Sequence, residues 1–75
     1  MNENIIKIVR KKLNLPQWKF AQRLKVTQSA LSHYEGGREP PVPVAYEVIN
    51  AAQEIGVKIK LEDIYPPLHR LTNKH

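Results

Sequence analysis

Residues 15–37 read LPQWKFAQRLKVTQSALSHYEGG and contain two short helical patterns with a break at Lys25-Val26 between them. Apolar side chains recur three and four positions apart on both sides of this break. They are Phe20, Ala21, Leu24, Ala30, Leu31 and Tyr34. Thr27 is a good N-cap for the second helix, and Gly36-Gly37 ends it. Two short helices joined by a turn of about three to four residues predict a helix-turn-helix.

A further helical pattern precedes this pair. We expect it to end near Asn14, because Pro16 disfavours helical backbone at the residue before it. Pro16 then suits the first position of the next helix, predicted over about 16–24, where its missing N–H group costs nothing. The apolar positions of the N-terminal helix are Ile5, Ile8, Val9 and Leu13.

The second half of the chain predicts one long helix and one short one. The long pattern runs over about 43–55, follows a proline-rich linker and is closed by Gly56. Residues 57–60 alternate like a strand, but an isolated strand of this length is marginal. Residues 61–65 then predict one last helical turn.

The composition is that of one small globular domain. The chain has 75 residues, 41% of them hydrophobic and 25% charged, and it has no cysteine. The lack of thiols excludes disulfides, thiolate chemistry and cysteine-ligated zinc, and no apolar run reaches the roughly 18–20 residues of a membrane helix. We therefore expect a cytoplasmic all-α domain, compact and of four or five helices, over residues 1–66. A flexible basic tail is expected at 67–75.

The net charge of +5 is concentrated in the first half of the chain. Residues 1–40 hold eight basic and three acidic side chains, which leaves +5, whereas residues 41–75 hold four of each and are neutral. A segregated basic surface indicates a polyanionic partner, most often nucleic acid.

The second helix of the pair presents a polar outward face. Its members are Gln28, Ser29, Ser32 and His33. Side chains of this kind are able to reach base edges in a major groove. An ordinary solvated helix face without a ligand is the alternative, and the spacing alone leaves both open.

These positions resemble the helix-turn-helix of the Cro/CI repressor family. The matching residues are Gln17, Phe20-Ala21, Leu24, Val26, Thr27-Gln28, Leu31-Ser32 and Glu35-x-Gly37. With the flanking helices the resemblance covers about residues 4–66, and the later stretch is similar to the YdaS-like and Cro-like prophage regulators. It implies a lambda-repressor-like DNA-binding domain with a recognition helix at about 27–36.

The resemblance also implies roles for individual residues. The base-contacting residues would be Gln28, Ser29, Ser32 and His33. The residues contacting the DNA backbone would be Gln17, Lys19, Thr27, Arg38, Arg10 and Lys12. For Arg10 and Lys12 a solvated face of the first helix is the alternative. We expect Trp18 to cover the edge of the core rather than to rest on sugar-phosphate.

One position departs from the family pattern. The family usually has glycine in the turn where this chain has Lys25. That position tends to need positive φ, which costs a lysine roughly 1 kcal/mol. We expect a strained or differently shaped turn, and the added cation is compatible with DNA binding.

Nothing in the sequence indicates catalysis or metal binding. His33, His69 and His75 lie far apart and lack the spacing of metal ligands. The chain has no nucleophile–base pair, no paired carboxylates and no glycine-rich phosphate loop. We therefore expect no enzyme activity, no metal and no cofactor.

The function expected is sequence-specific transcriptional regulation, of the phage or prophage Cro- or repressor-like type. The chain would bind a palindromic double-stranded DNA operator as a homodimer, because one recognition helix reads only a few base pairs. The dimer surface is expected at the last helix and near Ile59, Ile64 and Tyr65. One alternative is an antitoxin that binds a protein toxin and also regulates its own promoter, although the short tail leaves little chain for a toxin-binding arm. An RNA-binding or purely structural basic module is the other alternative.

Overall fold

A computed structural model describes residues 4–65 of the chain. Within that range the chain forms five helices and no strand, which confirms the all-α fold class. The helices are α1 (Ile5–Lys12), α2 (Gln17–Leu24), α3 (Gln28–Glu35), α4 (Val42–Glu54) and α5 (Leu61–Ile64). The predicted domain boundary at residue 66 and the predicted tail at 67–75 lie outside the described residues.

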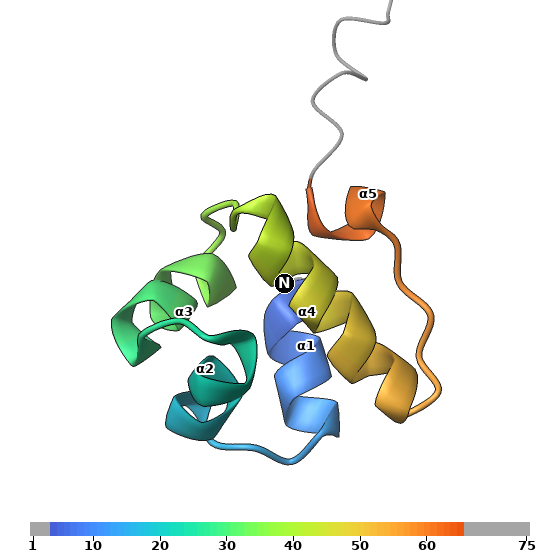
Figure 1. Cartoon of the computed structure of the whole chain (residues 1–75), viewed down its shortest axis with the longest axis horizontal. Helices are drawn as coiled ribbons and strands as arrows, with labels where there is room; N and C mark the ends of the chain where they lie inside the picture. Colours follow the sequence, from blue (N-terminus) through green and yellow to red (C-terminus); the bar gives the residue numbers. More distant parts are fainter. Residues whose placement is uncertain (1–3, 66–75) are drawn as a thin grey trace, which may run out of the picture.

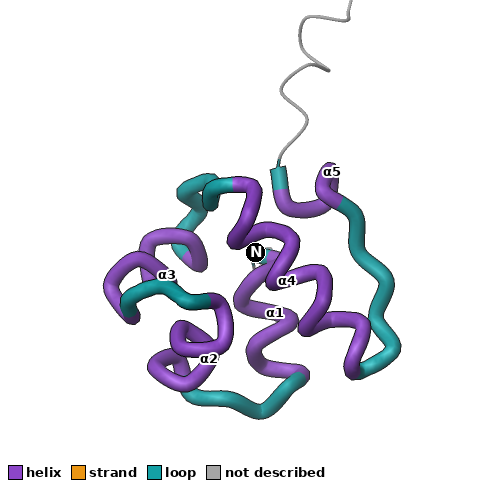
Figure 2. Tube along the Cα trace, in the orientation of Figure 1, coloured by secondary structure: helices purple, strands orange, loops and turns teal. Residues whose placement is uncertain are grey.

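The longest helix, α4, forms the middle of the molecule. Figure 1 shows α4 crossing α1, with α2 and α3 on one side and α5 on the other. The helix contacts α1, α2 and α5, while α3 packs against α1 and α2. Figure 2 shows an extended loop joining α4 to α5 along the side of the domain away from α3. The helix-turn-helix formed by α2 and α3 therefore lies at one edge of the fold.

A single apolar core receives side chains from all five helices. Its members are Ile6, Val9, Phe20, Ala21, Leu24, Leu31, Val44, Ala45, Val48, Ala51, Ala52 and Ile64. Three of the five contributed by α4 are alanines, whose small side chains let the neighbouring helices approach α4 closely. Phe20 and Leu31, which are fully buried, attach α2 and α3 to this core.

The buried face of α1 differs from the predicted one. Ile6 is buried, whereas Ile8, which we predicted inside, is only partly buried. Three isoleucines lie within four residues, so the sequence pattern fits more than one rotation of the helix. The contacts of α1 with α3, α4 and α5 decide which side faces inward.

The prediction for Pro16 is wrong by one position. Its backbone is extended, with φ −69° and ψ 161°, so it caps α2 from outside instead of forming the first helical residue. Its ring offers no side-chain cap, and the N–H groups of Lys19 and Phe20 both donate to its carbonyl, at 3.1 Å. The first turn of α2 therefore begins without a polar side chain over its N-terminus.

The four longer helices all end in the same way. A residue with positive φ follows the last turn, and the next N–H group donates to a carbonyl five positions back. The positive-φ residues are Asn14, Lys25, Gly37 and Gly56. Glycine and asparagine tolerate this backbone, so Lys25 is the exception among them. Its φ of 64° and ψ of 41° confirm the left-handed turn that the sequence predicts.

Replacing Lys25 by glycine is expected to raise the free energy of unfolding by about 0.5–1 kcal/mol, because glycine adopts this backbone without a Cβ clash. The lysine ammonium lies 3.7 Å from the Glu47 carboxylate, but its side chain is 78% exposed, so losing this pair costs little. Urea unfolding of Lys25→Gly beside Lys25→Ala is the measurement. Alanine removes the same ion pair and keeps the left-handed strain, so only glycine should stabilise. Equal stability of the two variants would show that the turn is unstrained.

Candidate nucleic-acid interface

The turn before α3 fixes the position of that helix. Thr27 is its N-cap, as predicted, and its Oγ1 accepts a hydrogen bond from the Ala30 N–H at 3.0 Å. Val26 packs partly buried against the core, and Leu31 is fully buried on the inner side of α3. With its start capped and its inner side anchored, α3 turns one defined face outward.

That outward face carries the four residues predicted to contact bases. Gln28, Ser29, Ser32 and His33 are all exposed, whereas Leu31 between them is fully buried. Positions three and four apart share one side of a helix. The structure therefore brings these four side chains onto a single open surface at the edge of the domain.

A chain of hydrogen bonds crosses the three N-terminal helices beneath this surface. Arg10 of α1 donates to both carboxylate oxygens of Glu35, from Nε at 2.6 Å and from Nη2 at 3.1 Å. Gln17 of α2 donates from Nε2 to Glu35 Oε1 at 3.1 Å. Gln28 of α3 donates from Nε2 to Gln17 Oε1 at 3.3 Å. The Glu35 side chain is 5% exposed, so the chain runs from a buried carboxylate to the first residue of α3.

The carboxylate at the buried end fixes the orientation of both amides. An ionised carboxylate only accepts hydrogen bonds, so Gln17 presents its Nε2 to Glu35 and turns Oε1 towards Gln28. Gln28 must then donate from Nε2. Its Oε1 and its second N–H hydrogen remain for a ligand that offers one donor and one acceptor side by side, as the adenine edge does.

Arg10 is engaged inside the domain rather than turned towards a partner. Besides its two bonds to Glu35, it donates from Nη1 to the Leu15 carbonyl at 3.1 Å. Its side chain is 16% exposed. Arg10 is therefore not a solvated surface residue, and its contact with the DNA backbone stays a prediction. Glu35 entered the sequence analysis only as part of a helix-ending motif, and its structural role was missed.

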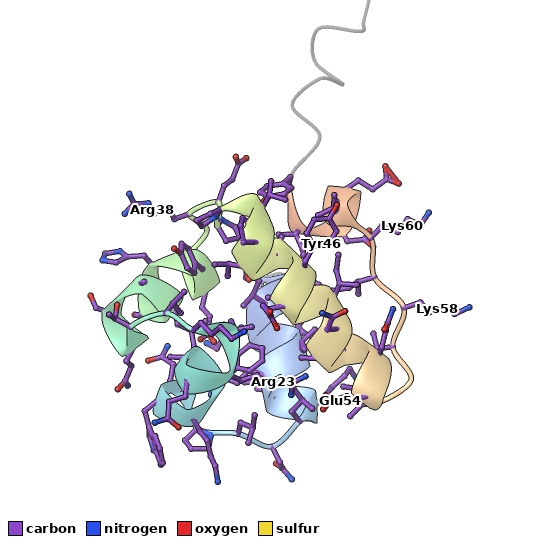
Figure 3. The ribbon with its side chains drawn as sticks, viewed as in Figure 1. Arg23, Arg38, Tyr46, Glu54, Lys58 and Lys60 are labelled. Carbon is purple, nitrogen blue, oxygen red and sulfur yellow. The ribbon has the colours of Figure 1, made fainter. Side chains whose placement is uncertain are left out.

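Within residues 4–65, other cations of the basic half also lie beside carboxylates of the same chain. Besides Arg10, Lys25 lies near Glu47, and Arg23 donates from Nη1 to Glu54 Oε1 at 3.1 Å. Figure 3 shows Arg23 and Glu54 next to each other where α2 and α4 meet.

Three of the predicted backbone-contacting cations lie exposed. They are Lys12, Lys19 and Arg38. Figure 3 shows Arg38 projecting outward beyond the end of α3. Its backbone N–H donates to the His33 carbonyl at 3.0 Å, so the chain at Arg38 is fixed to the last turn of that helix.

Trp18 does not cover the core as we predicted. Its side chain is 52% exposed, and it stands outside the set of apolar residues that pack against the core. Phe20, Ala21 and Leu24 occupy the buried side of α2, and Trp18 lies outside that side. The Lys19 ammonium lies 6.0 Å from the centre of its ring.

Two residues predicted to form the dimer surface make contacts inside the domain itself. Ile64 is buried in the core, and the Tyr65 hydroxyl donates to the Pro40 carbonyl at 2.6 Å. Burial raises the pKa of Tyr65, and the charge of Glu39 adds to this effect. The large apolar side chains that lie exposed in the described part of the chain are instead Trp18, Val42 and Tyr46.

Over residues 4–65 the structure holds no cluster of three or more histidine, cysteine or acidic side chains that could bind a metal ion. His69 and His75 lie outside this range. The helices of the same range are too short, and too polar, for any of them to span a bilayer.

The chain matches the model of a known domain family. The family model of the RsaL-like HTH domain matches residues 7–48, which extend from α1 into α4 and are more than half of the chain. The matched segment includes all ten residues predicted for the site, from Arg10 to Arg38. No curated protein and no solved structure matches the chain.

Proposed function

The chain belongs to the family of the RsaL-like HTH domain, and from this premise we propose that it regulates transcription by binding duplex DNA sequence-specifically through α3. Helix-turn-helix regulators act by binding DNA, typically without enzyme activity, and place the second helix of the motif in the major groove. The observation that carries the proposal is Gln28, exposed at the start of α3 and held by a hydrogen-bond chain that ends on a buried carboxylate.

Base recognition is assigned to the open face of α3. Gln28 pairs with an adenine, donating to N7 and accepting from N6, while guanine offers two acceptors at the same edge and is disfavoured. Ser29, Ser32 and His33 reach further base edges along the groove. Because Gln17 orients the Gln28 amide before DNA arrives, part of the ordering cost of this contact is already met in the free protein.

Backbone contacts are assigned to residues around this face. Lys12, Lys19 and Arg38 bind phosphates by charge. Thr27 donates its hydroxyl hydrogen, because its cap bond to Ala30 uses Oγ1 only as an acceptor. Gln17 keeps one amide hydrogen for a phosphate near the start of α2. Arg10 is left out, because Glu35 and the Leu15 carbonyl already engage its guanidinium.

We propose that two copies bind a palindromic operator as a homodimer, and that the chain is a cytoplasmic repressor of the Cro/CI or prophage type. A single short helix reads few base pairs, so a second copy doubles the recognised sequence. Val42 and Tyr46 lie one turn apart on α4, about half exposed, and remain available to a second copy where Ile64 is not. No feature of residues 4–65 favours the antitoxin alternative.

Replacing Gln28 by alanine is expected to remove the preference for adenine at one base pair of each half-site. The lost bidentate pair should cost about 1–3 kcal/mol of discrimination at that position. A binding-site selection from a random duplex library, run with the wild-type chain and with Gln28→Ala, measures this directly. The wild-type selection should also return two half-sites whose centres are about 10 base pairs apart.

Gln53→Ala is the matched control for this selection. Gln53 is an exposed glutamine in the last turn of α4, away from α3, so its loss should leave the selected sequence unchanged. The melting temperatures of both variants should stay close to that of the wild type, because both side chains point outward and alanine favours helix. If Gln28→Ala selects the same sequence as the wild type at every position, α3 does not read bases through Gln28.

A further inference from the structure

We infer that Trp18 is a further DNA contact, in which its indole ring packs on a deoxyribose of the backbone beside the start of α2. This inference rests on the proposed function, because it assumes that α3 lies in the major groove. Its starting observation is that Trp18 is 52% exposed on α2, a helix that buries its other apolar side chains in the core.

The position of Trp18 links it to the reading helix. It follows Gln17, whose Oε1 accepts the hydrogen bond from Gln28 at 3.3 Å. The first turn of α2 is therefore tied to the first residue of α3. When α3 enters the groove by that end, the first turn of α2 meets the sugar-phosphate backbone that borders the groove.

The surroundings of the ring favour a polyanion over an apolar partner. The Lys19 ammonium lies 6.0 Å from the ring centre, and Lys19 is itself exposed. A phosphate held by Lys19 brings its own deoxyribose next to the indole. The ring then covers the apolar face of the sugar while the ammonium neutralises the charge of the phosphate. Trp18 and Lys19 therefore contact the sugar and the phosphate of the same nucleotide.

The chemistry of this contact predicts two separable effects. Sugar burial is sequence-independent and releases no counterion, so loss of Trp18 should weaken all duplexes equally without changing the dependence on salt. Loss of Lys19 should reduce the salt dependence by about one phosphate contact per protomer. A protein partner bound at Trp18 would produce neither effect on DNA.

The experiment uses the fact that Trp18 is the single tryptophan of the chain, so its fluorescence reports on this site alone. The probe is a duplex that carries one half-site of the sequence selected by the wild-type chain. Saturation with this duplex should shift the emission of the wild-type protein and protect it from quenching by acrylamide. Trp18→Ala should bind the duplex about tenfold more weakly, with an unchanged salt slope, and Trp18→Phe should recover most of the loss.

Tyr46→Ala is the matched control, because Tyr46 is also 52% exposed but lies on α4. On a single half-site it should bind as tightly as the wild type, and its Trp18 emission should respond to DNA in the same way. Two results together would overturn this inference alone. The wild-type chain would bind the duplex without any change in its emission, and Trp18→Ala would bind the duplex as tightly as the wild type. A wild-type chain that binds no duplex would overturn the proposed function together with it.

Discussion

Replacing Arg10 by alanine is expected to destabilise the domain by about 3 kcal/mol, which lowers the melting temperature of a domain of this size by about 12–24 °C. The variant keeps the Glu35 carboxylate, whose side chain is 5% exposed, and removes the guanidinium that binds both of its oxygens. Gln17 stays as a neutral donor. A buried charge that loses its counter-ion pays its desolvation cost without the attraction that offset it.

The pair between Arg23 and Glu54 is the control for this prediction. It joins α2 to α4 through the same two residue types, but its side chains are 31% and 57% exposed. Arg23→Ala should therefore cost no more than about 1 kcal/mol. Thermal melting of the two variants side by side makes the comparison. An equal fall in melting temperature would mean that burial of the Arg10–Glu35 pair adds nothing to the stability of the domain.

A double variant separates stability from recognition. Arg10→Met combined with Glu35→Leu replaces both charges by apolar side chains of similar size, and such replacements of buried pairs are often neutral or stabilising. Gln17 then loses the carboxylate that fixes its amide, and Gln28 loses its fixed partner in turn. The double variant should melt near the wild-type temperature and yet discriminate adenine less well in the binding-site selection.

The hydrogen-bond chain from Arg10 to Gln28 could not be predicted from the sequence, whereas the helices could. The period of apolar residues and the turn signals predicted the helices and the helix-turn-helix, because these features depend on neighbours in the chain. The pairing of Arg10 with Glu35 joins residues 25 positions apart and depends on how α1 and α3 pack. Counting charges located the basic half of the chain, but it could not show which cations the fold neutralises.

Trp18 and Ile64 were misplaced for a related reason. Trp18 lies in the first turn of α2, and Ile64 is the last residue of α5. At such terminal positions the spacing of apolar residues does not decide between the core and the surface. Ile64 is buried because α5 packs on α1 and α4, and Trp18 is exposed because Phe20 and Leu24 fill the inner side of α2. Lys25 was predicted correctly, since the left-handed turn is a local backbone property.

Raising the salt concentration from 50 to 200 mM is expected to weaken operator binding by about a thousandfold, the loss that follows from about six neutralised phosphates. The count comes from the three exposed cations that we assign to phosphates, Lys12, Lys19 and Arg38, taken twice for a homodimer. Each neutralised phosphate adds about −0.9 to the slope of log affinity against log salt. A gel-shift titration at four or five salt concentrations gives that slope, and a value near zero would exclude binding through these cations.

Arg38→Gln should reduce this slope by about 0.9 per protomer, whereas two other variants that lose one positive charge should leave it nearly unchanged. Lys58 lies on the opposite side of the molecule from Arg38 (Figure 3). Arg23 stands on α2, as Lys19 does, but it is already bound to Glu54. Lys58→Gln and Arg23→Gln therefore lower the net charge as much as Arg38→Gln does, without removing a phosphate contact. If all three variants changed the slope equally, affinity would follow the net charge of the chain, and docking through α3 would be refuted.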